Sequence, residues 1–492
     1  MAHEPSRYRF GPLEPGGALG GLSWGQLATA ASGLAALVIA LHAVPGPMGA
    51  FIGLMLAAAA LVGAFARVGG RPQVAWVAGA GGFATRRLRG ANRHRSSAPT
   101  IGRGGRLLPE VAYPEILRGV RILSASTAGG EIGVVRDGAT WTAVLAVDGG
   151  SFALLEPADK ERRLARWGAV LAGLARPGSP VSRLQWLERT VAQPVDELGR
   201  YLRDGIALPP SHASVRSYLE LLDDAGPAAR QHETFVCLQV DARRGGRAMR
   251  QAGGGDSGAC AVVLRELQNL SERLLQAEAL VRGALSPRLL ARAIRLGFDP
   301  DARPGLDRRG AGDLELSGVA PANAGPMAAD EGWRRYRSDG AQHVTYWVSE
   351  WPRVDVGADF LLPFLLGATT RRAMSVVIEP VDPARAMRAA ENARTNEASD
   401  DELRARLGFL STARRRRQQE ALATREEEIA DGHAACRFSG YVTVSAGSED
   451  ELEAACAEVE QTAQMSRLEL RPLFGEQAVG FTYTLPLCRG LR

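Results

Sequence analysis

A long uncharged stretch near the amino terminus constrains this chain more than any other feature. Between Glu14 and Arg67 no Asp, Glu, Lys or Arg occurs, and the Pro-Gly-Pro of residues 45–47 divides the stretch into two apolar halves, 27–44 and 48–66. At about 1.5 Å per residue, each half approaches the roughly 30 Å of hydrocarbon in a bilayer, where a helix satisfies its own backbone hydrogen bonds. The sequence therefore predicts a transmembrane helical hairpin.

Two other interpretations of the stretch are weaker. A buried hairpin in a globular core would normally carry a polar stripe, but only Thr29, Ser32 and His42 interrupt the two halves. A cleaved signal peptide is disfavoured because a second, equally long apolar run follows the first. The membrane interpretation therefore ranks first.

Arginines predict how the hairpin is oriented. They precede it at Arg7 and Arg9 and follow it from Arg67 onwards, whereas the turn carries none. The positive-inside rule then predicts a protein of the cell (inner) membrane, with both termini and the bulk of the chain in the cytoplasm. The residues expected at the membrane interface, in contact with lipid, are Trp24, Arg67, Arg71 and Trp76.

Composition limits the chemistry that the 492 residues can perform. The net charge is only +5, and Lys160 is the single lysine; such an excess of arginine reflects a GC-rich genome. A P-loop needs a lysine directly after glycine, but Lys160 follows Asp159, so a Walker-type ATPase is excluded. The five cysteines show neither a CxxC pair nor zinc-ligand spacing, and we expect no metal and no cofactor.

One short motif resembles a catalytic one. Residues 255–258, Gly-Asp-Ser-Gly, match the serine motif of chymotrypsin-like proteases, and a hydrolase could pair Ser257 with His212 or His232. A long amphipathic helix follows at once, however, so Asp256 or Ser257 is better explained as its N-cap. We therefore predict that the chain is not an enzyme.

The pattern beyond the hairpin predicts an α+β fold. Asp137-Gly138 is a turn signal between two Val-rich strands, and Ser448 with Glu451 forms a capping box that opens a helix. Further strands are expected at 120–123, 233–241, 343–351, 374–379, 441–445, 467–473 and 479–485, and helices at 159–174, 195–203, 212–223 and from 257 or 260 to 282. The predicted organisation is a lead-in (1–20), the transmembrane hairpin (21–68), a basic juxtamembrane linker (69–110), a first α+β lobe (111–300), a loop (301–330) and a second α+β lobe (331–492). Both lobes are expected to have antiparallel sheets, and the second lobe is expected to contain a helical hairpin insertion at 383–431.

Several of these segments resemble known proteins of conjugation machines. The strands in residues 133–138 and 144–149, the passage 421–444 and the Leu-Pro-Leu of residues 485–487 resemble the amino-terminal domain of the TraC/TraE-like ATPases of type IV secretion. The hairpin resembles the two-helix PrgI-like components of the same machines. The resemblance implies a membrane-anchored docking subunit without a motor of its own, served by a separate P-loop conjugation-type ATPase.

The predicted function is therefore a structural subunit of a conjugation or type IV secretion-like apparatus. The resemblance implies a homo-oligomer or a multi-subunit membrane complex that handles DNA or protein cargo transiently. Candidate interface residues are the aromatic side chains of an exposed strand, Tyr346, Trp347 and Trp351, and the cationic run Arg414, Arg415, Arg416 and Arg417. The alternatives are a membrane-tethered adaptor that binds DNA or a substrate through its arginines, and the hydrolase.

Overall fold

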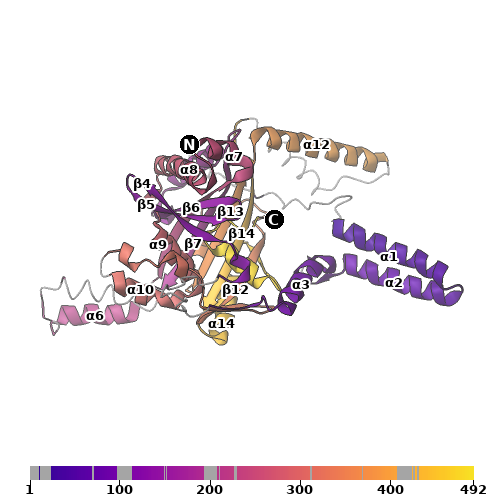
Figure 1. Cartoon of the computed structure of the whole chain (residues 1–492), viewed down its shortest axis with the longest axis horizontal. Helices are drawn as coiled ribbons and strands as arrows, with labels where there is room; N and C mark the ends of the chain where they lie inside the picture. The colour runs from indigo at the N-terminus through magenta and orange to yellow at the C-terminus, as the bar shows by residue number, and fades with distance from the viewer. Residues whose placement is uncertain are drawn as a thin grey trace, which may run out of the picture.

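The computed structural model describes residues 10, 24–68, 71–96, 113–148, 150, 152–192, 205, 208–209, 211–225, 230–310, 313–367, 369–406, 424, 427–428 and 431–491. Figure 1 shows a body built on a large sheet, from which a hairpin of two helices projects. The helices are α1 (Trp24–Ala43), α2 (Pro47–Phe65), α3 (Gln73–Leu88), α4 (Pro157–Leu174), α6 (Ala213–Ala225), α7 (Ala242–Gln251), α8 (Gly255–Gln276), α9 (Pro287–Phe298), α10 (Arg303–Gly310), α11 (Leu362–Gly367), α12 (Pro383–Arg406), α14 (Glu449–Met465) and α15 (Gln477–Phe481).

The body is organised by a 13-stranded sheet in which all the neighbouring strands pair antiparallel. Its order is β3-β10-β11-β12-β14-β13-β7-β8-β6-β5-β4, with β15 pairing β12 and β9 pairing β6; a separate pair, β1 with β2, follows the hairpin. The strands are β1 (Arg67–Val68), β2 (Arg71–Pro72), β3 (Arg93–Arg95), β4 (Arg121–Thr127), β5 (Gly130–Asp137), β6 (Thr140–Asp148), β7 (Val181–Ala192), β8 (Arg230–Asp241), β9 (Leu280–Ala284), β10 (Ala328–Glu331), β11 (Tyr336–Ser338), β12 (Ala341–Glu350), β13 (Arg372–Pro380), β14 (Cys436–Ala446) and β15 (Glu469–Pro472).

Local sequence signals explain several of these elements. The turn between β5 and β6 begins at Gly138, whose φ of 60° is a conformation that glycine adopts without strain. Helix α14 begins where the Ser448 side chain accepts a hydrogen bond from the backbone N–H of Glu451, as the capping box predicts. The mixed helix and sheet content agrees with the predicted α+β class.

One sheet runs through both of the predicted lobes. Strand β7 pairs with β8 on one side and with β13 on the other, so strands from the first and second halves of the chain are neighbours. Strand β7 is not among the strands predicted from the sequence, although its Leu184 and Leu187 are fully buried. The division into lobes at 301–330 remains a prediction, but the antiparallel pairing continues across it.

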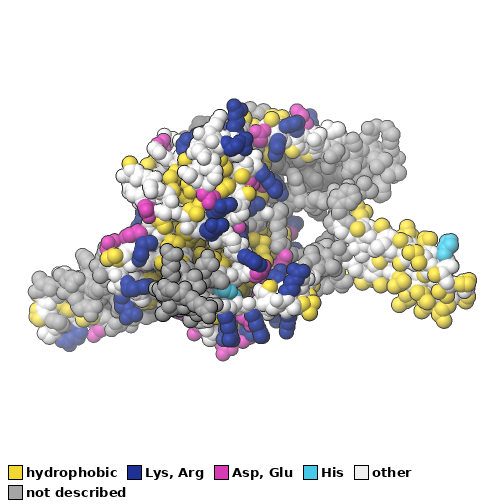
Figure 2. Space-filling model, viewed as in Figure 1, with side chains coloured by type: hydrophobic (Ala, Val, Ile, Leu, Met, Phe, Trp, Pro, Cys, Tyr) yellow, Lys and Arg dark blue, Asp and Glu magenta, His cyan; other side chains and the backbone are white. Residues whose placement is uncertain are grey.

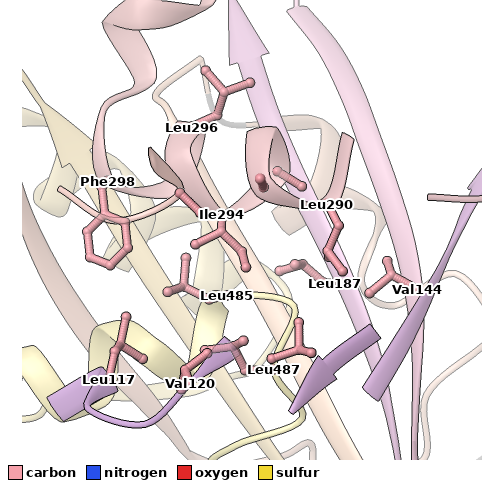
Figure 3. Packing of buried hydrophobic residues seen from close by; sticks show 14 of the residues in the cluster. Leu117, Val120, Val144, Leu187, Leu290, Ile294, Leu296, Phe298, Leu485 and Leu487 are labelled. Carbon is pink, nitrogen blue, oxygen red and sulfur yellow. The ribbon is translucent and has the colours of Figure 1, made fainter. Parts of the chain in front are cut away.

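Helices cover both faces of the sheet. Over one face, helices α4, α7 and α8 pack on β5–β8, and α11 and α14 pack on β12–β14. Over the other face lie α9 and the carboxy-terminal segment from α15 onwards (Figure 3). In the close-up, Ile294 and Leu290 from α9 point toward Leu187 of β7 and Leu485 of the carboxy-terminal segment. Alternate residues of the central strands therefore enter two separate cores.

The carboxy-terminal segment is tied to the centre of the sheet by one glutamine. Gln185 on β7 donates to the carbonyls of Tyr483 and Leu485 and accepts from the backbone N–H of Cys488, at 2.8–3.1 Å. The predicted strand at 479–485 was wrong: residues 477–481 form α15 and a 3-10 turn, Thr482–Thr484, follows. The apolar residues of this segment pack down onto the sheet and do not form a strand of it.

Two further elements differ from the sequence predictions. The helix expected to run to Arg282 ends at Gln276, and β9 follows it to pair with β6. Residues 301–330, expected to be a loop, contain helix α10. The helix expected at 195–203 lies outside the described residues.

Candidate functional site: the apolar hairpin and its junction with the body

Helices α1 and α2 expose apolar side chains around their surface. Both are long and apolar enough to cross a membrane. Leu54 and Met55, near the middle of α2, are 64% and 58% exposed, and Leu34 and Phe51 are also largely exposed. Figure 2 shows this apolar surface projecting away from the charged body. Such an exposed area in water would drive aggregation, whereas in a bilayer it contacts lipid.

Small residues hold the two helices together. A Cβ atom at Gly33 would lie 2.5 Å from the Cβ of Ala60, and one at Gly53 would lie 2.7 Å from Leu37 Cδ1. This close approach is how transmembrane helices associate in the absence of a hydrophobic driving force. In addition, the Gln26 side-chain amide donates to the carbonyl of Ala64 at 3.0 Å and so links the two ends of the hairpin.

The junction between hairpin and body consists of helix α3, Glu331, Trp333 and Gly475. Arg86 of α3 donates two hydrogen bonds, both 2.8 Å long, to the carboxylate of Glu331, and a third to the carbonyl of Gly475. The rings of Phe83 and Trp333 meet edge to face at 5.3 Å. Residues 73–88, within the expected basic linker, therefore form a helix docked on the body, with Phe83 packed against Trp333.

Backbone pairing extends the junction. Strand β3, which follows α3, pairs with β10 and places His94 opposite Ala329. The left-handed backbone of Gly475 (φ 72°) brings it under Trp333, where a Cβ atom would lie 2.5 Å from the ring. The junction is thus assembled from three segments, and more than 200 residues separate α3 and β3 from the other two.

The predicted aromatic interface residues are not on the surface. Tyr346 and Trp351 are buried in the core beneath α14, and Trp347 is half-buried. The Tyr346 hydroxyl donates to Glu460 at 3.0 Å, and the Trp347 indole donates to Ser439 at 3.1 Å. The expectation of an exposed strand was wrong because β12 pairs with β11, β14 and β15 and is covered by helices.

The remaining predicted interface residues are only partly described. Trp24 begins α1, Arg67 lies in β1, Arg71 lies in β2 and Trp76 lies in α3, but their side chains are outside the described part of the structure. The cationic run Arg414, Arg415, Arg416 and Arg417 lies entirely outside the described residues. Their proposed contacts with lipid or partners remain predictions.

The structure does not assemble the hydrolase site. Asp256, next to Ser257, accepts a hydrogen bond from Trp141, which pairs with Val240, whereas His232 lies at the other end of β8. At about 3.3 Å per residue, residues 232 and 240 are roughly 26 Å apart. His212 precedes α6, far from α8 in Figure 1. Neither Asp256 nor Ser257 is the N-cap of α8, since Gly254 occupies that position.

Among the described residues no group of three or more His, Cys, Asp or Glu side chains could hold a metal ion. Lys160 lies in the first turn of α4 and forms an ion pair with Asp359, its Nζ 3.3 Å from Oδ2.

Arg86 and Glu331 of the junction were not among the residues predicted from the sequence to be functional. Neither has a local sequence signal, because only the contact between the two in the folded chain marks them.

Part of the chain matches the model of a known protein family. The family model described as "Putative type VII ESX secretion system translocon, EccE" matches residues 228–348, less than half of the chain. The matched segment runs from β8 through α7–α10 to β12, and so includes Glu331 and Trp333 of the junction. No curated relative matches the chain.

This match overturns the assignment to conjugation machinery. The type IV interpretation, with its PrgI-like and TraC/TraE-like parts and its conjugation-type ATPase partner, was wrong, because the family that matches belongs to type VII secretion. The motifs behind that interpretation describe general features: residues 133–148 are an antiparallel hairpin, and two apolar helices occur in many membrane proteins. Neither feature identifies a family.

Proposed function

We propose that this chain is a membrane-anchored, non-catalytic component of a type VII (ESX) secretion translocon. The observation that supports this most directly is the family match over residues 228–348. The exposed apolar hairpin provides the membrane anchor, and the junction fixes the body next to the membrane. The partners are then the other subunits of a multi-subunit membrane secretion complex.

The proposed topology follows from the charges. The turn between α1 and α2 carries no charge, whereas the segment from α3 to β3 holds Arg86, Arg87, Arg89, Arg93 and Arg95. The positive-inside rule then places the turn outside and the body in the cytoplasm. In this arrangement the body lies where subunits of a secretion machine can dock on it from the cytoplasmic side.

Membrane association and assembly can be tested together with matched double variants. Leu54→Arg/Met55→Arg replaces two side chains of α2 that are 64% and 58% exposed, and Leu314→Arg/Leu316→Arg replaces two on the body with the same exposed fractions. Each arginine at the centre of a transmembrane helix costs about 2.5–3.5 kcal/mol. We expect the first variant to leave the carbonate-washed membrane fraction and the second to stay in it.

The same cells test the function. The tagged wild-type chain, solubilised in mild detergent from cells that contain a type VII system, should co-purify with the other translocon subunits, and the α2 variant should not. A wild-type chain in the aqueous fraction, or equal behaviour of the two double variants, would contradict the anchor. A membrane-bound chain that purifies without any translocon subunit would contradict the assignment to this machine.

Topology is tested by cysteine labelling in intact cells. Met48→Cys near the turn and Leu314→Cys on the body are matched, since both native side chains are 64% exposed. In a background in which the half-buried Cys436 and Cys456 are serine, an impermeant maleimide should label position 48 at once and position 314 only after permeabilisation. The reverse pattern would invert the proposed orientation.

A further inference from the structure

A cavity of about 320 Å³ opens at the ends of β7, β13 and β14, between the sheet and the segment that joins α9 to α10. Its volume is at the small end of the range for ligand sites, about 300–1,000 Å³. Most of its walls are apolar, and the apolar residues include Val191, Leu296, Pro300, Pro304, Ala373, Phe481 and Leu485. Such walls suit a small ligand with an apolar part.

One charged side chain in the wall has no partner. Arg189 on β7 is only 5% exposed, and none of its three guanidinium nitrogens has a hydrogen-bond partner among the described residues. The guanidinium carbon lies 5.7 Å from the centre of the Phe235 ring, and a Cβ atom at Gly297 would lie 3.6 Å from Nη2. A Cβ atom at Gly297 would also lie 2.4 Å from Leu485 Cδ2, so Leu485 fills the space beside this glycine and packs next to the guanidinium.

The other arginines on the same face of the sheet as Arg189 are each in an ion pair. Arg303 lies 2.8 Å from Glu233, Arg371 pairs with Asp301, and Arg292 behind them pairs with Asp307. Arg372, the next arginine on β13, belongs to the opposite face of the sheet, where its guanidinium lies over Phe364 and donates to the carbonyl of Leu365 at 2.6 Å. On the face of the sheet that carries Arg189, these three ion pairs leave its charge as the excess charge, although Arg372 also lines the cavity.

Arg189 is difficult to explain as a stabilising residue. Burial lowers the pKa of its guanidinium and nearby Glu233 raises it, but an arginine stays charged at neutral pH. A buried charge without a hydrogen-bonded partner costs several kcal/mol of stability, and apolar replacement of such groups is often neutral or stabilising. A bound oxyanion would remove this cost, because a planar guanidinium pairs with an oxyanion through two parallel hydrogen bonds.

We propose that this cavity binds a small amphiphilic monoanion, whose oxyanion group pairs with Arg189 and whose apolar part lies against Leu296, Phe481 and Leu485. The single excess charge on this face of the sheet favours a monoanion over a nucleotide or another polyanion, and the apolar walls select against a bare inorganic ion. The inference does not depend on the proposed secretion function, since it uses only the geometry of the cavity.

The test uses the full chain in nanodiscs of neutral lipid, with octanoate as the probe. Octanoate should bind saturably, above the partition measured in empty nanodiscs, and should raise the melting temperature. Octanol, which lacks the charge, and inorganic phosphate, which lacks the apolar part, should bind at least tenfold more weakly. Equal binding of octanol and octanoate, or no saturable octanoate binding up to millimolar concentration, would overturn the proposal.

Substitutions of Arg189 distinguish a ligand-binding role of this side chain from a purely structural one. Arg189→Met should weaken octanoate binding at least tenfold and leave the ligand-free melting temperature unchanged or raised, while Arg189→Lys should retain part of the binding. The matched control is Arg295→Met, because Arg295 is a mostly buried arginine of α9 that donates to Gly325 and pairs with Asp299 and Asp339 at 2.8–3.0 Å. It should lower the melting temperature and leave binding intact. Unchanged binding in Arg189→Met would refute the assignment.

Discussion

Replacement of Arg86 by methionine tests whether the junction fixes the hairpin to the body. The Glu331 side chain is only 2% exposed and receives two hydrogen bonds from Arg86. The substitution therefore leaves a buried carboxylate that keeps a long hydrogen bond, 3.4 Å, from the backbone N–H of Ala478. Removal of one partner of a buried ion pair costs about 3–5 kcal/mol. Because Arg86 is 25% exposed, we take the lower end, about 3 kcal/mol.

Hydrogen exchange of the full chain in nanodiscs measures this loss locally. Since 1.4 kcal/mol is a factor of ten, about 3 kcal/mol corresponds to a roughly 100-fold increase in the opening of α3 and β3. Peptides covering residues 79–96 should therefore exchange about 100-fold faster in Arg86→Met, whereas peptides from α8 should not change.

A neighbouring ion pair provides the control. Arg93 lies 3.6 Å from Asp330, but both side chains are largely exposed, and an exposed pair contributes about 0–1 kcal/mol. Arg93→Met should therefore speed exchange by no more than about fivefold. If the two variants accelerated exchange equally, the burial of Glu331 would not be what holds the junction together.

Two further predictions concern the body and the hairpin. His343 is fully buried between Ser338 and Ser445, whose hydroxyl oxygens each lie 2.8 Å from a ring nitrogen. Burial lowers the pKa of His343 from 6.5 to about 3. Since the unfolded state then binds a proton at a higher pH than the folded state, the free energy of unfolding decreases as the pH falls from 6.5 toward 3. Urea unfolding at pH 7 and pH 5 should show a loss of about 1–2 kcal/mol that is absent in His343→Gln; an equal loss in both would assign it to other groups. In the hairpin, Gly33→Val should lower thermal stability in nanodiscs because a Cβ there meets Ala60, while Gly63→Val, which meets nothing within 4 Å, should not; equal effects would contradict the helix packing.

The sequence by itself determined the features that depend on near neighbours. The uncharged stretch predicts two long apolar helices, Asp137-Gly138 predicts the turn between β5 and β6, and Ser448 predicts the start of α14, and the structure confirms these elements. Each depends on local backbone preference or on the side-chain pattern of one element, which a run of consecutive residues contains in full.

Only the tertiary structure decided which elements are covered and which charges are paired. Aromatic residues such as Tyr346 and Trp351 occur both in core strands and in exposed strands. In this chain they are buried, because other strands pair with β12 and helices cover it. Arg86 finds its carboxylate 245 residues away, while Arg189, with an equally ordinary local sequence, finds none among the described residues. Burial and pairing are properties of surroundings assembled from distant segments, and no local pattern around either arginine records them.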